Sequence, residues 1–290
     1  MVNPLDIVNL TPLMNIASGK AQTIVALIDG PVALSQPAFA GRNIREISTG
    51  VSGRCTQTSS VACTHGTFLA GILCANRGSN ALSVCPDCTL LIRPIFIETT
   101  LEFEQMPTAT PEALVAAIIE SIDSGAQIIN MSIALTQPSS EGERKLEEAL
   151  NYAARRGVII VVAAGNQGTL ASSVITRHSW VIPVVACNSF GKPINSSNLG
   201  SSIGRRGLMA PGDAVKSIGA KGEPVMLGGT SVAAPFVTGT IALLCSEFPT
   251  AEAIEVKSAV TQVYAGKRKT VVPPLLDAWA AYQVMAKARC

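Results

Sequence analysis

The sequence contains few aromatic residues, little net charge and no long apolar run, and each of these shortages excludes a class of protein. Aromatics account for 4% of the 290 residues, so Ala, Val, Ile and Leu must build the core. Lys and Arg total 22 against 20 Asp and Glu, which gives no electrostatic support for a nucleic-acid partner or an anionic membrane. Apolar runs such as residues 158–164 fall well short of the roughly 20 residues that span a membrane. With 48% hydrophobic and 14% charged residues, the chain is instead expected to fold around a buried core.

The first 15 residues lack the features of a secretory signal. They include Asp6, and no Lys or Arg precedes their apolar residues. We therefore expect a cytoplasmic location. Only 28 residues precede Asp29, so we expect either that folding needs no prodomain or that a prosegment has been removed from this sequence.

Eight cysteines are present. In the reducing compartment that the missing signal implies, free thiols are the expected state. If the protein meets an oxidant, local disulfides between Cys55 and Cys63 or between Cys85 and Cys88 are the alternatives, and the sequence does not decide the pairing. Zinc sites of four cysteines use two Cys-x-x-Cys pairs, whereas this chain has only one, at Cys85 and Cys88, so no metal site is expected.

Apolar, β-branched runs alternate with segments of helical periodicity along the chain. This alternation is typical of βαβ units and predicts an α/β fold with a mostly parallel, twisted central sheet between two layers of helices. No repeat or long linker divides the sequence, so residues 1–290 are interpreted as one domain, with an extended arm at 1–20 and a helical tail at 276–290. The predicted strands are 23–28, 90–96, 127–132, 158–164 and 181–186, and the predicted helices are 66–75, 111–124, 141–156 and 231–247.

Four residues have the chemistry and the local context of nucleophilic catalysis. Asp29 ends an apolar strand and precedes Gly-Pro, where an Asx turn is the structural alternative. His65, one of two histidines, lies on a helix whose small residues allow close packing, and it is a natural general base. Ser231 follows Gly-Gly-Thr at the start of a helix, where a serine also serves as an N-cap. Asn166 follows a buried strand, so its carboxamide is either an oxyanion donor or a turn residue.

The order Asp, His, Ser and the motifs around these residues resemble the subtilisin-like serine proteases, the subtilases. The resemblance implies that Ser231 attacks the peptide carbonyl, His65 transfers the proton and Asp29 orients the imidazole. It also implies that Asn166 and the Ser231 backbone N–H bind the oxyanion. The motifs that carry it are the Asp29 strand, the His65 helix, residues 129–132, 163–166 and 209–212, the Ser231 block at 228–239, and residues 276–281.

Two segments are implied to bind the substrate, one by pairing with its backbone as a strand and one by walling the pocket for the side chain before the cut bond. They are Ser132, Ile133 and Ala134, and Ala163, Ala164 and Gly165, respectively. The sequence also departs from the family. Gly30-Pro31 stands where many relatives have a small hydroxyl residue and then Gly. Loop 75–84 has no carboxylate where relatives often bind calcium, so no cofactor is expected and calcium is not supported.

Residues 85–96 and 271–279 resemble the proteases that mature cyanobactin precursor peptides. That group includes leader-cleaving proteases and macrocyclases, and the macrocyclases carry a helical insertion that shields the acyl-enzyme from water. Asp29 and His65 are 36 residues apart (65 − 29), which leaves little room for such an insertion. We therefore expect a serine endopeptidase acting on a peptide or precursor peptide. A transpeptidase or macrocyclase is the alternative, and a peptide-binding pseudoprotease is the third hypothesis.

The sequence leaves the preferred substrate side chains and the oligomeric state open. Glu98, Glu102 and Glu104 are interpreted as a solvated loop, with a preference for basic residues in the non-primed subsites as the alternative. His178 is interpreted as a surface residue or as part of the wall of the specificity pocket.

Overall fold

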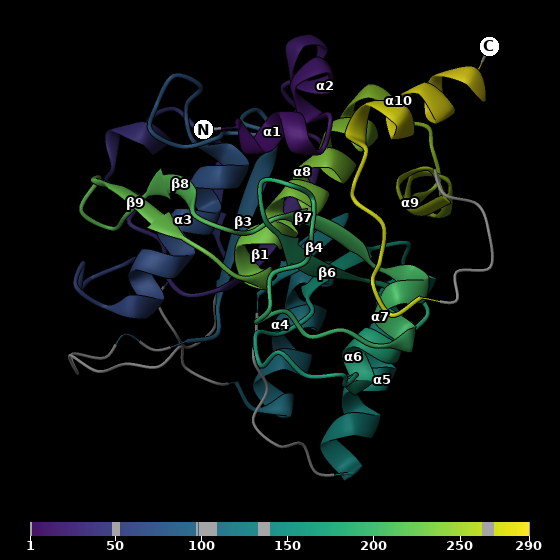
Figure 1. The fold of residues 1–290 in the computed structure, drawn as a ribbon. Helices are drawn as coiled ribbons and strands as arrows, with labels where there is room; N and C mark the ends of the chain where they lie inside the picture. The colour runs from purple at the N-terminus through teal and green to yellow at the C-terminus, as the bar shows by residue number, and fades with distance from the viewer. Residues whose placement is uncertain are drawn as a thin grey trace.

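A computed structural model of the chain describes residues 2–47, 53–96, 98, 109–132, 140–262 and 270–289. At its centre lies a seven-stranded sheet whose order is β2-β3-β1-β4-β5-β6-β7, with every neighbouring pair parallel (Figure 1). Its strands are β1 (Ile24–Asp29), β2 (Ile44–Glu46), β3 (Thr89–Pro94), β4 (Ile128–Met131), β5 (Ile159–Ala163), β6 (Val181–Cys187) and β7 (Leu208–Pro211). A separate antiparallel hairpin contains β8 (Val215–Ile218) and β9 (Pro224–Leu227).

Helices cover both faces of this sheet, because alternate residues of each strand point to opposite sides. On β1, Val25 and Leu27 pack into the core beneath α3 (Val61–Cys74) and α8 (Thr230–Glu247). Ala26 and Ile28 pack on the other side beneath α4 (Pro111–Asp123) and α5 (Ser140–Arg155). The predicted α/β fold is therefore confirmed. The remaining helices are α1 (Pro4–Ile7), α2 (Leu10–Ile16), the short η1 (Pro37–Phe39), α6 (Val174–Arg177), α7 (Ser201–Arg206), α9 (Ala253–Gln262) and α10 (Ala278–Lys287).

Helix α8 is the central helix of the fold and packs against β4, β5, β6 and β7. Among the described residues it is also the one helix long and apolar enough to cross a membrane. Its apolar character has a simpler explanation, since 83% of that apolar stretch is buried inside the fold. A helix that is apolar all round is expected in the core of an α/β protein of this size.

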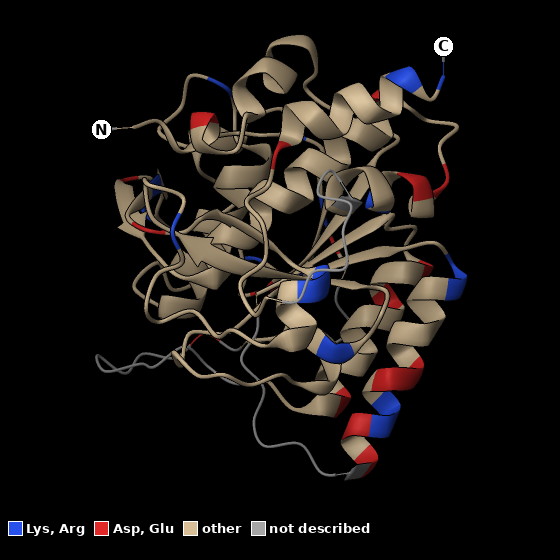
Figure 2. Ribbon diagram, turned by 45° about the vertical axis from the view of Figure 1, so that its right-hand side comes forward, with Lys and Arg blue, Asp and Glu red and all other residues tan. Residues whose placement is uncertain are grey.

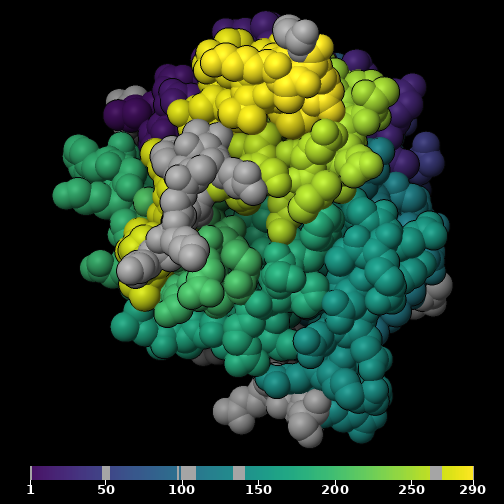
Figure 3. All heavy atoms as spheres, turned by 90° about the vertical axis from the view of Figure 1, so that its right-hand side faces the viewer, coloured from purple at the N-terminus to yellow at the C-terminus, as the bar shows by residue number. Residues whose placement is uncertain are grey.

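The first 20 residues are not the extended arm that was predicted. They form α1 and α2, in which Leu10, Leu13 and Met14 repeat at helical spacing and are buried against the core. The tail forms α10 as expected, and it packs on α2, with the Ala278 N–H donating to the Val8 carbonyl at 2.9 Å. Figure 3 shows this C-terminal helix lying over the α8 and α9 region beside the N-terminal segment. The two ends of the chain therefore stabilise one another.

Loop 75–84, which lacks carboxylates, is held by its own cation. The Arg77 guanidinium donates to the carbonyls of Met14 and Ala17, both at 2.7 Å, and to that of Val84 at 3.3 Å. Met14 lies in the last turn of α2, where carbonyl groups lack intrahelical partners and a positive charge is favourable. A guanidinium therefore joins the loop to the N-terminal helices.

Acidic and basic residues are interspersed on α5, as Figure 2 shows along that helix. Two pairs one turn apart make salt bridges, Arg144 with Glu148 at 2.6 Å and Lys145 with Glu141 at 2.9 Å. Fully exposed pairs of this kind contribute little to stability, because water and salt screen the two charges. They account for the charge of α5 as a solvated helix face.

Candidate active site

Two glycines bring the end of β1 against α3. A Cβ atom on Gly30 would lie 2.0 Å from the carbonyl oxygen of Ala62, and one on Gly66 would lie 2.4 Å from the carbonyl oxygen of Gly30. Both contacts are too close for any side chain. The close approach explains why no hydroxyl residue follows Asp29 here, and it places Asp29 beside His65 on the helix.

Asp29, His65 and Ser231 form one hydrogen-bonded chain. His65 Nδ1 lies 2.8 Å from Asp29 Oδ1, and His65 Nε2 lies 3.1 Å from Ser231 Oγ. Asp29 is fully buried and also accepts the Gly30 N–H at 2.7 Å, whereas His65 is 6% exposed. An anionic carboxylate accepts from Nδ1–H, which leaves Nε2 as the acceptor for the serine hydroxyl. The sequence-predicted catalytic side chains are thus brought together in the order that general-base catalysis requires.

Ser231 lies in the first turn of α8, at the positive end of the helix dipole. Its backbone N–H is among the first four of the helix, which have no intrahelical acceptor. Gly229 precedes the helix with φ of 120°, a conformation that favours glycine, and a Cβ there would approach Asn166 Nδ2 to 3.0 Å. The Gly-Gly-Thr-Ser turn therefore leaves space for the asparagine beside the serine.

Asn166 is oriented by the residue that precedes Ser231. Its Oδ1 accepts two hydrogen bonds from Thr230, from the backbone N–H at 2.9 Å and from the hydroxyl at 3.0 Å. Since Oδ1 is occupied, the Nδ2 group is the part of the carboxamide that remains to donate to a ligand. Asn166 is exposed, as a donor that faces bound substrate must be.

Ser132, predicted to bind substrate, contacts the serine turn. Pro235 has no N–H, so the carbonyl of Ser231 lacks the usual helical donor four residues on. The Ser132 hydroxyl donates to this carbonyl at 3.3 Å. Asn130 Nδ2 donates to Ser132 Oγ at 3.2 Å and accepts through Oδ1 from the Thr238 hydroxyl at 2.7 Å. A buried polar network from β4 to α8 thus supports the turn, and the sequence analysis did not identify it.

The other predicted substrate residues are only partly described by the structure. Ala163 is the last residue of β5 and Ala164 follows it, each 8% exposed, and Gly165 comes next with φ of 105°. The Gly165 N–H donates to the Thr230 hydroxyl at 3.1 Å, so this segment lies beside the serine turn. Ile133 and Ala134 lie outside the described residues.

Glu98 and His178 have local structural partners. The Glu98 carboxylate accepts the N–H groups of Thr56 and Gln57, both at 2.9 Å, and so binds a neighbouring loop. Glu102 and Glu104 lie outside the described residues. His178 Nε2 lies 3.3 Å from Asn151 Oδ1 on α5, and burial lowers the His178 pKa.

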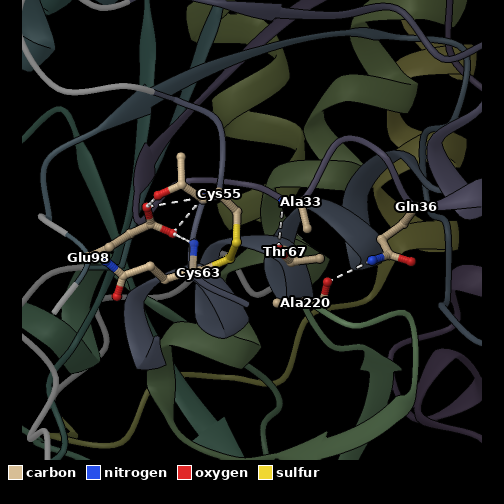
Figure 4. Close-up of a disulfide and its surroundings, with 9 residues drawn as sticks. Ala33, Gln36, Cys55, Cys63, Thr67, Glu98 and Ala220 are labelled. Atoms are coloured by element: carbon tan, nitrogen blue, oxygen red, sulfur yellow. Dashed lines mark hydrogen bonds between the residues drawn. A yellow bond between two sulfur atoms is a disulfide. The ribbon is translucent and has the colours of Figure 1, made fainter. Parts of the chain in front are cut away.

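The expectation of free thiols is wrong for two cysteines. Cys55 and Cys63 form a disulfide, with Cα atoms 5.5 Å apart, immediately before the His65 turn of α3 (Figure 4). Within the described part of the chain, the one group of three residues close enough to hold a metal contains this pair and Glu98. Because both sulfurs are bonded to each other, neither is a thiolate ligand.

The remaining described cysteines are free, including the Cys-x-x-Cys pair. Cys85 and Cys88 are buried, and a hydrogen bond between them lowers the pKa of Cys88. Burial raises the pKa of Cys187 and of Cys245 to about 12, so these two are protonated at neutral pH. None of these four is hydrogen-bonded to Asp29, His65 or Ser231 within the described residues.

Known sequences give an independent view of the site. Residues 20–271 match the subtilase family. Subtilisin DY of Bacillus licheniformis is 31% identical over 202 residues, which cover 68% of this chain and 69% of that protein. The thermophilic serine proteinase of Bacillus sp. strain AK1 is 30% identical over 200 residues, and these cover 68% of this chain but only 46% of that protein.

Solved structures agree. A serine-to-alanine mutant of the protease domain of PatA superposes with a TM-score of 0.83 at 26% identity, covering 95% of this chain and 99% of that one. The prenylagaramide maturation protease PagA gives 0.80 at 26%, covering 96% and 98%. The PatG macrocyclase in complex with peptide gives 0.82 at 22%, covering 98% of both chains, which shows the fold alone. With the Asp-His-Ser geometry, these matches establish that the chain belongs to the subtilase family of serine proteases.

Proposed function

We propose that the protein is an endopeptidase that cuts peptide bonds through an acyl-enzyme on Ser231. The observation that carries the proposal is the continuous chain from buried Asp29 through His65 to Ser231 Oγ, with contacts of 2.8 and 3.1 Å. The residue types, their order along the chain and their hydrogen bonding all match the serine-protease mechanism.

The proposed mechanism gives each group one step. Ser231 Oγ attacks the carbonyl carbon while His65 Nε2 accepts its proton, and Asp29 stabilises the imidazolium through Nδ1–H. Asn166 Nδ2 and the Ser231 N–H donate to the oxyanion that forms. His65 then gives its proton to the leaving amine. A water deprotonated by the same imidazole hydrolyses the acyl-enzyme.

The substrate that we propose is a peptide segment within a precursor peptide. Support comes from the protease domain of PatA and from the maturation protease PagA. Each is 26% identical to this chain over nearly its whole length. Hydrolysis is favoured over transpeptidation by the segment between Asp29 and His65. Its described parts, 30–47 and 53–64, contain η1, β2 and the first turn of α3, and no further helix that could cover the cleft. Macrocyclisation remains the second candidate, since the PatG macrocyclase shares the fold.

We further propose that folding and catalysis need no calcium. The Arg77 guanidinium supports this proposal, since it already donates to the carbonyl oxygens of Met14, Ala17 and Val84. A metal cation placed beside it would be repelled.

The test is mass-spectrometric profiling of a diverse peptide library with wild type, Ser231→Ala and Ser179→Ala. Ser179 lies just before β6, at the end of that strand opposite to the catalytic residues, so its variant serves as the matched control. We expect cleaved products that have gained water with wild type and Ser179→Ala, and none with Ser231→Ala. Products lacking that water would favour the transpeptidase, and unchanged cleavage by Ser231→Ala would contradict the proposed nucleophile.

A further inference from the structure

The Cys55–Cys63 disulfide lies within two residues of the catalytic histidine. Cys63 is in the first turn of α3 and fully buried, and it packs with Ala33 and Ala220. Cys55 is half-buried on the segment that leads into the helix. Figure 4 shows the bridge joining this segment to the helix. The disulfide therefore fixes the turn from which His65 projects.

The same segment is bonded to the loop that follows Asp29. The Val32 N–H donates to the Gly53 carbonyl at 2.9 Å, and the Cys55 N–H donates to the Val32 carbonyl at 3.1 Å. Val32 is three residues beyond Asp29. Through Cys55, the disulfide thus connects the Asp29 loop to the helix that carries His65.

A second contact joins the Asp29 loop to α3, on the C-terminal side of His65. The Ala33 N–H donates to the Thr67 hydroxyl at 2.9 Å, two residues after the histidine (Figure 4). The first turn of α3 also packs against Gly30 through Ala62, but hydrogen bonds at helix ends are the first to fray. The disulfide supplies the restraint at that end.

Glu98 fixes the segment just beyond Cys55. Its carboxylate accepts the N–H groups of Thr56 and Gln57 and, at 2.5 Å, the Thr56 hydroxyl. A carboxylate oxygen lies within 4.8 Å of both sulfurs. Hydrogen bonds to a charged acceptor are about twice as strong as neutral ones. Glu98 therefore restrains the half-buried side of the bridge.

We propose that Cys55, Cys63 and Glu98 are positioning residues for catalysis, and that reduction of the disulfide lowers the rate of the enzyme. The proposal rests on the proposed function, because it acts through His65. The reductant is a small dithiol. Its thiolate attacks Cys55 Sγ, the more accessible sulfur, the Cys55–Cys63 bond breaks, and Cys63 leaves as a thiolate that takes a proton. The second thiol of the reductant then displaces Cys55, so that two protein thiols and one cyclic disulfide result.

The rate falls because His65 loses its fixed distance to Ser231. A misplacement of about 1 Å costs on the order of 10²-fold in rate. Substrate binding depends on other segments, so we expect kcat to fall about 10- to 100-fold while KM changes less than about twofold. A role in overall stability alone would leave kcat per folded molecule unchanged.

The experiment compares steady-state kinetics of the wild type before and after dithiothreitol, with the free thiols at residues 55 and 63 confirmed by alkylation and peptide mapping. Cys55→Ala removes the bridge permanently, and Cys245→Ser, at the end of α8 far from His65, is the matched cysteine control. Circular dichroism verifies that each sample is folded. We expect reduced wild type and Cys55→Ala to share the low kcat, dithiothreitol to leave Cys55→Ala unaffected, and Cys245→Ser to respond like wild type.

Two outcomes overturn the inference. One is full kcat in reduced wild type, and the other is loss of folded structure in both reduced wild type and Cys55→Ala, which would make the bridge a general structural support. Two other results would instead contradict the proposed function. One is an oxidised wild type that is inactive on every peptide, and the other is an oxidised Ser231→Ala variant that stays active. The two failures are therefore distinguishable.

Discussion

The two segments on either side of α3 are both held in place by hydrogen bonds between a charged side chain and backbone groups, but the two side chains have opposite charge. Segment 53–60 precedes the helix, and two of its backbone N–H groups, those of Thr56 and Gln57, donate to the Glu98 carboxylate. Loop 75–84 follows the helix and is held by the Arg77 guanidinium, which binds backbone carbonyls. Only the first segment is also tied covalently, by the Cys55–Cys63 disulfide.

We infer from this difference that a restraint close to His65 affects the catalytic rate, whereas a restraint far from it affects only the stability of the fold. The disulfide ends two residues before the histidine, so we infer that it governs catalysis. Arg77 lies beyond the C-terminal end of α3 and contacts the N-terminal helices, so we infer that it governs stability. The predictions below separate these two effects.

Asn166→Ala should cause the largest loss of kcat among these variants, because it changes a group that contacts the substrate. Removing the Nδ2 donor leaves the oxyanion with backbone donation, and we expect kcat to fall about 10²- to 10³-fold, the loss measured for subtilisin's own oxyanion asparagine. Steady-state kinetics on a cleaved peptide gives the value. An unchanged rate would show that backbone donors suffice.

Glu98→Ala should act on catalysis more than on stability. Without the carboxylate, three donors on Thr56 and Gln57 lose their acceptor, and the Cys55 side of the disulfide loses one of its restraints. We expect kcat to fall about tenfold, with Glu98→Gln intermediate because its amide oxygen still accepts. Glu147→Ala, on the exposed face of α5, is the control. Equal kcat for Glu98→Ala, Glu98→Gln and Glu147→Ala would contradict a role of Glu98 in catalysis.

Arg77→Ala should show the opposite pattern. Three carbonyls lose a charged donor, and we expect the free energy of unfolding to fall by about 1–3 kcal/mol, with kcat within about twofold of wild type. Urea unfolding measures the first quantity and initial rates the second. Arg45→Ala, an exposed arginine on β2, should change stability by less than about 0.5 kcal/mol. A large loss of kcat in folded Arg77→Ala would contradict the assignment.

Chelation should have the smallest effect. Because a guanidinium occupies the carbonyl oxygens beside loop 75–84, EDTA is expected to leave both Tm and activity unchanged. Thermal unfolding with EDTA and with added CaCl₂ tests this. A rise in Tm on calcium addition would indicate a bound cation and contradict the role given to Arg77.

The sequence predicts the layered fold because its signals are local. Buried parallel strands are continuous apolar runs, and β1, β3, β4, β5 and β6 lie within a residue or two of the predicted ranges. The N-terminal segment was misjudged, because the apolar spacing of Leu10, Leu13 and Met14 is helical but short. Strand β2 has three residues, with two of them exposed, and carries no such signal.

The candidate site was predictable in its residue types but not in its supports. Asp29, His65, Ser231 and Asn166 stand in recognisable motifs. The partners that hold them are distant in sequence and lack a motif. Cys55–Cys63 was one of two possible local pairs, and its choice depends on Cα atoms 5.5 Å apart in the folded chain. The contacts of Arg77 with carbonyl groups 60 and 63 residues away are likewise decided by the fold.

The most direct test of the central claim is the rate at which a fluorophosphonate labels the protein, followed by intact mass and peptide mapping. We expect wild type to gain one label, on Ser231, His65→Ala to react far more slowly, and Ser231→Ala not to react. Labelling at another residue, or equal labelling of wild type and Ser231→Ala, would contradict the account.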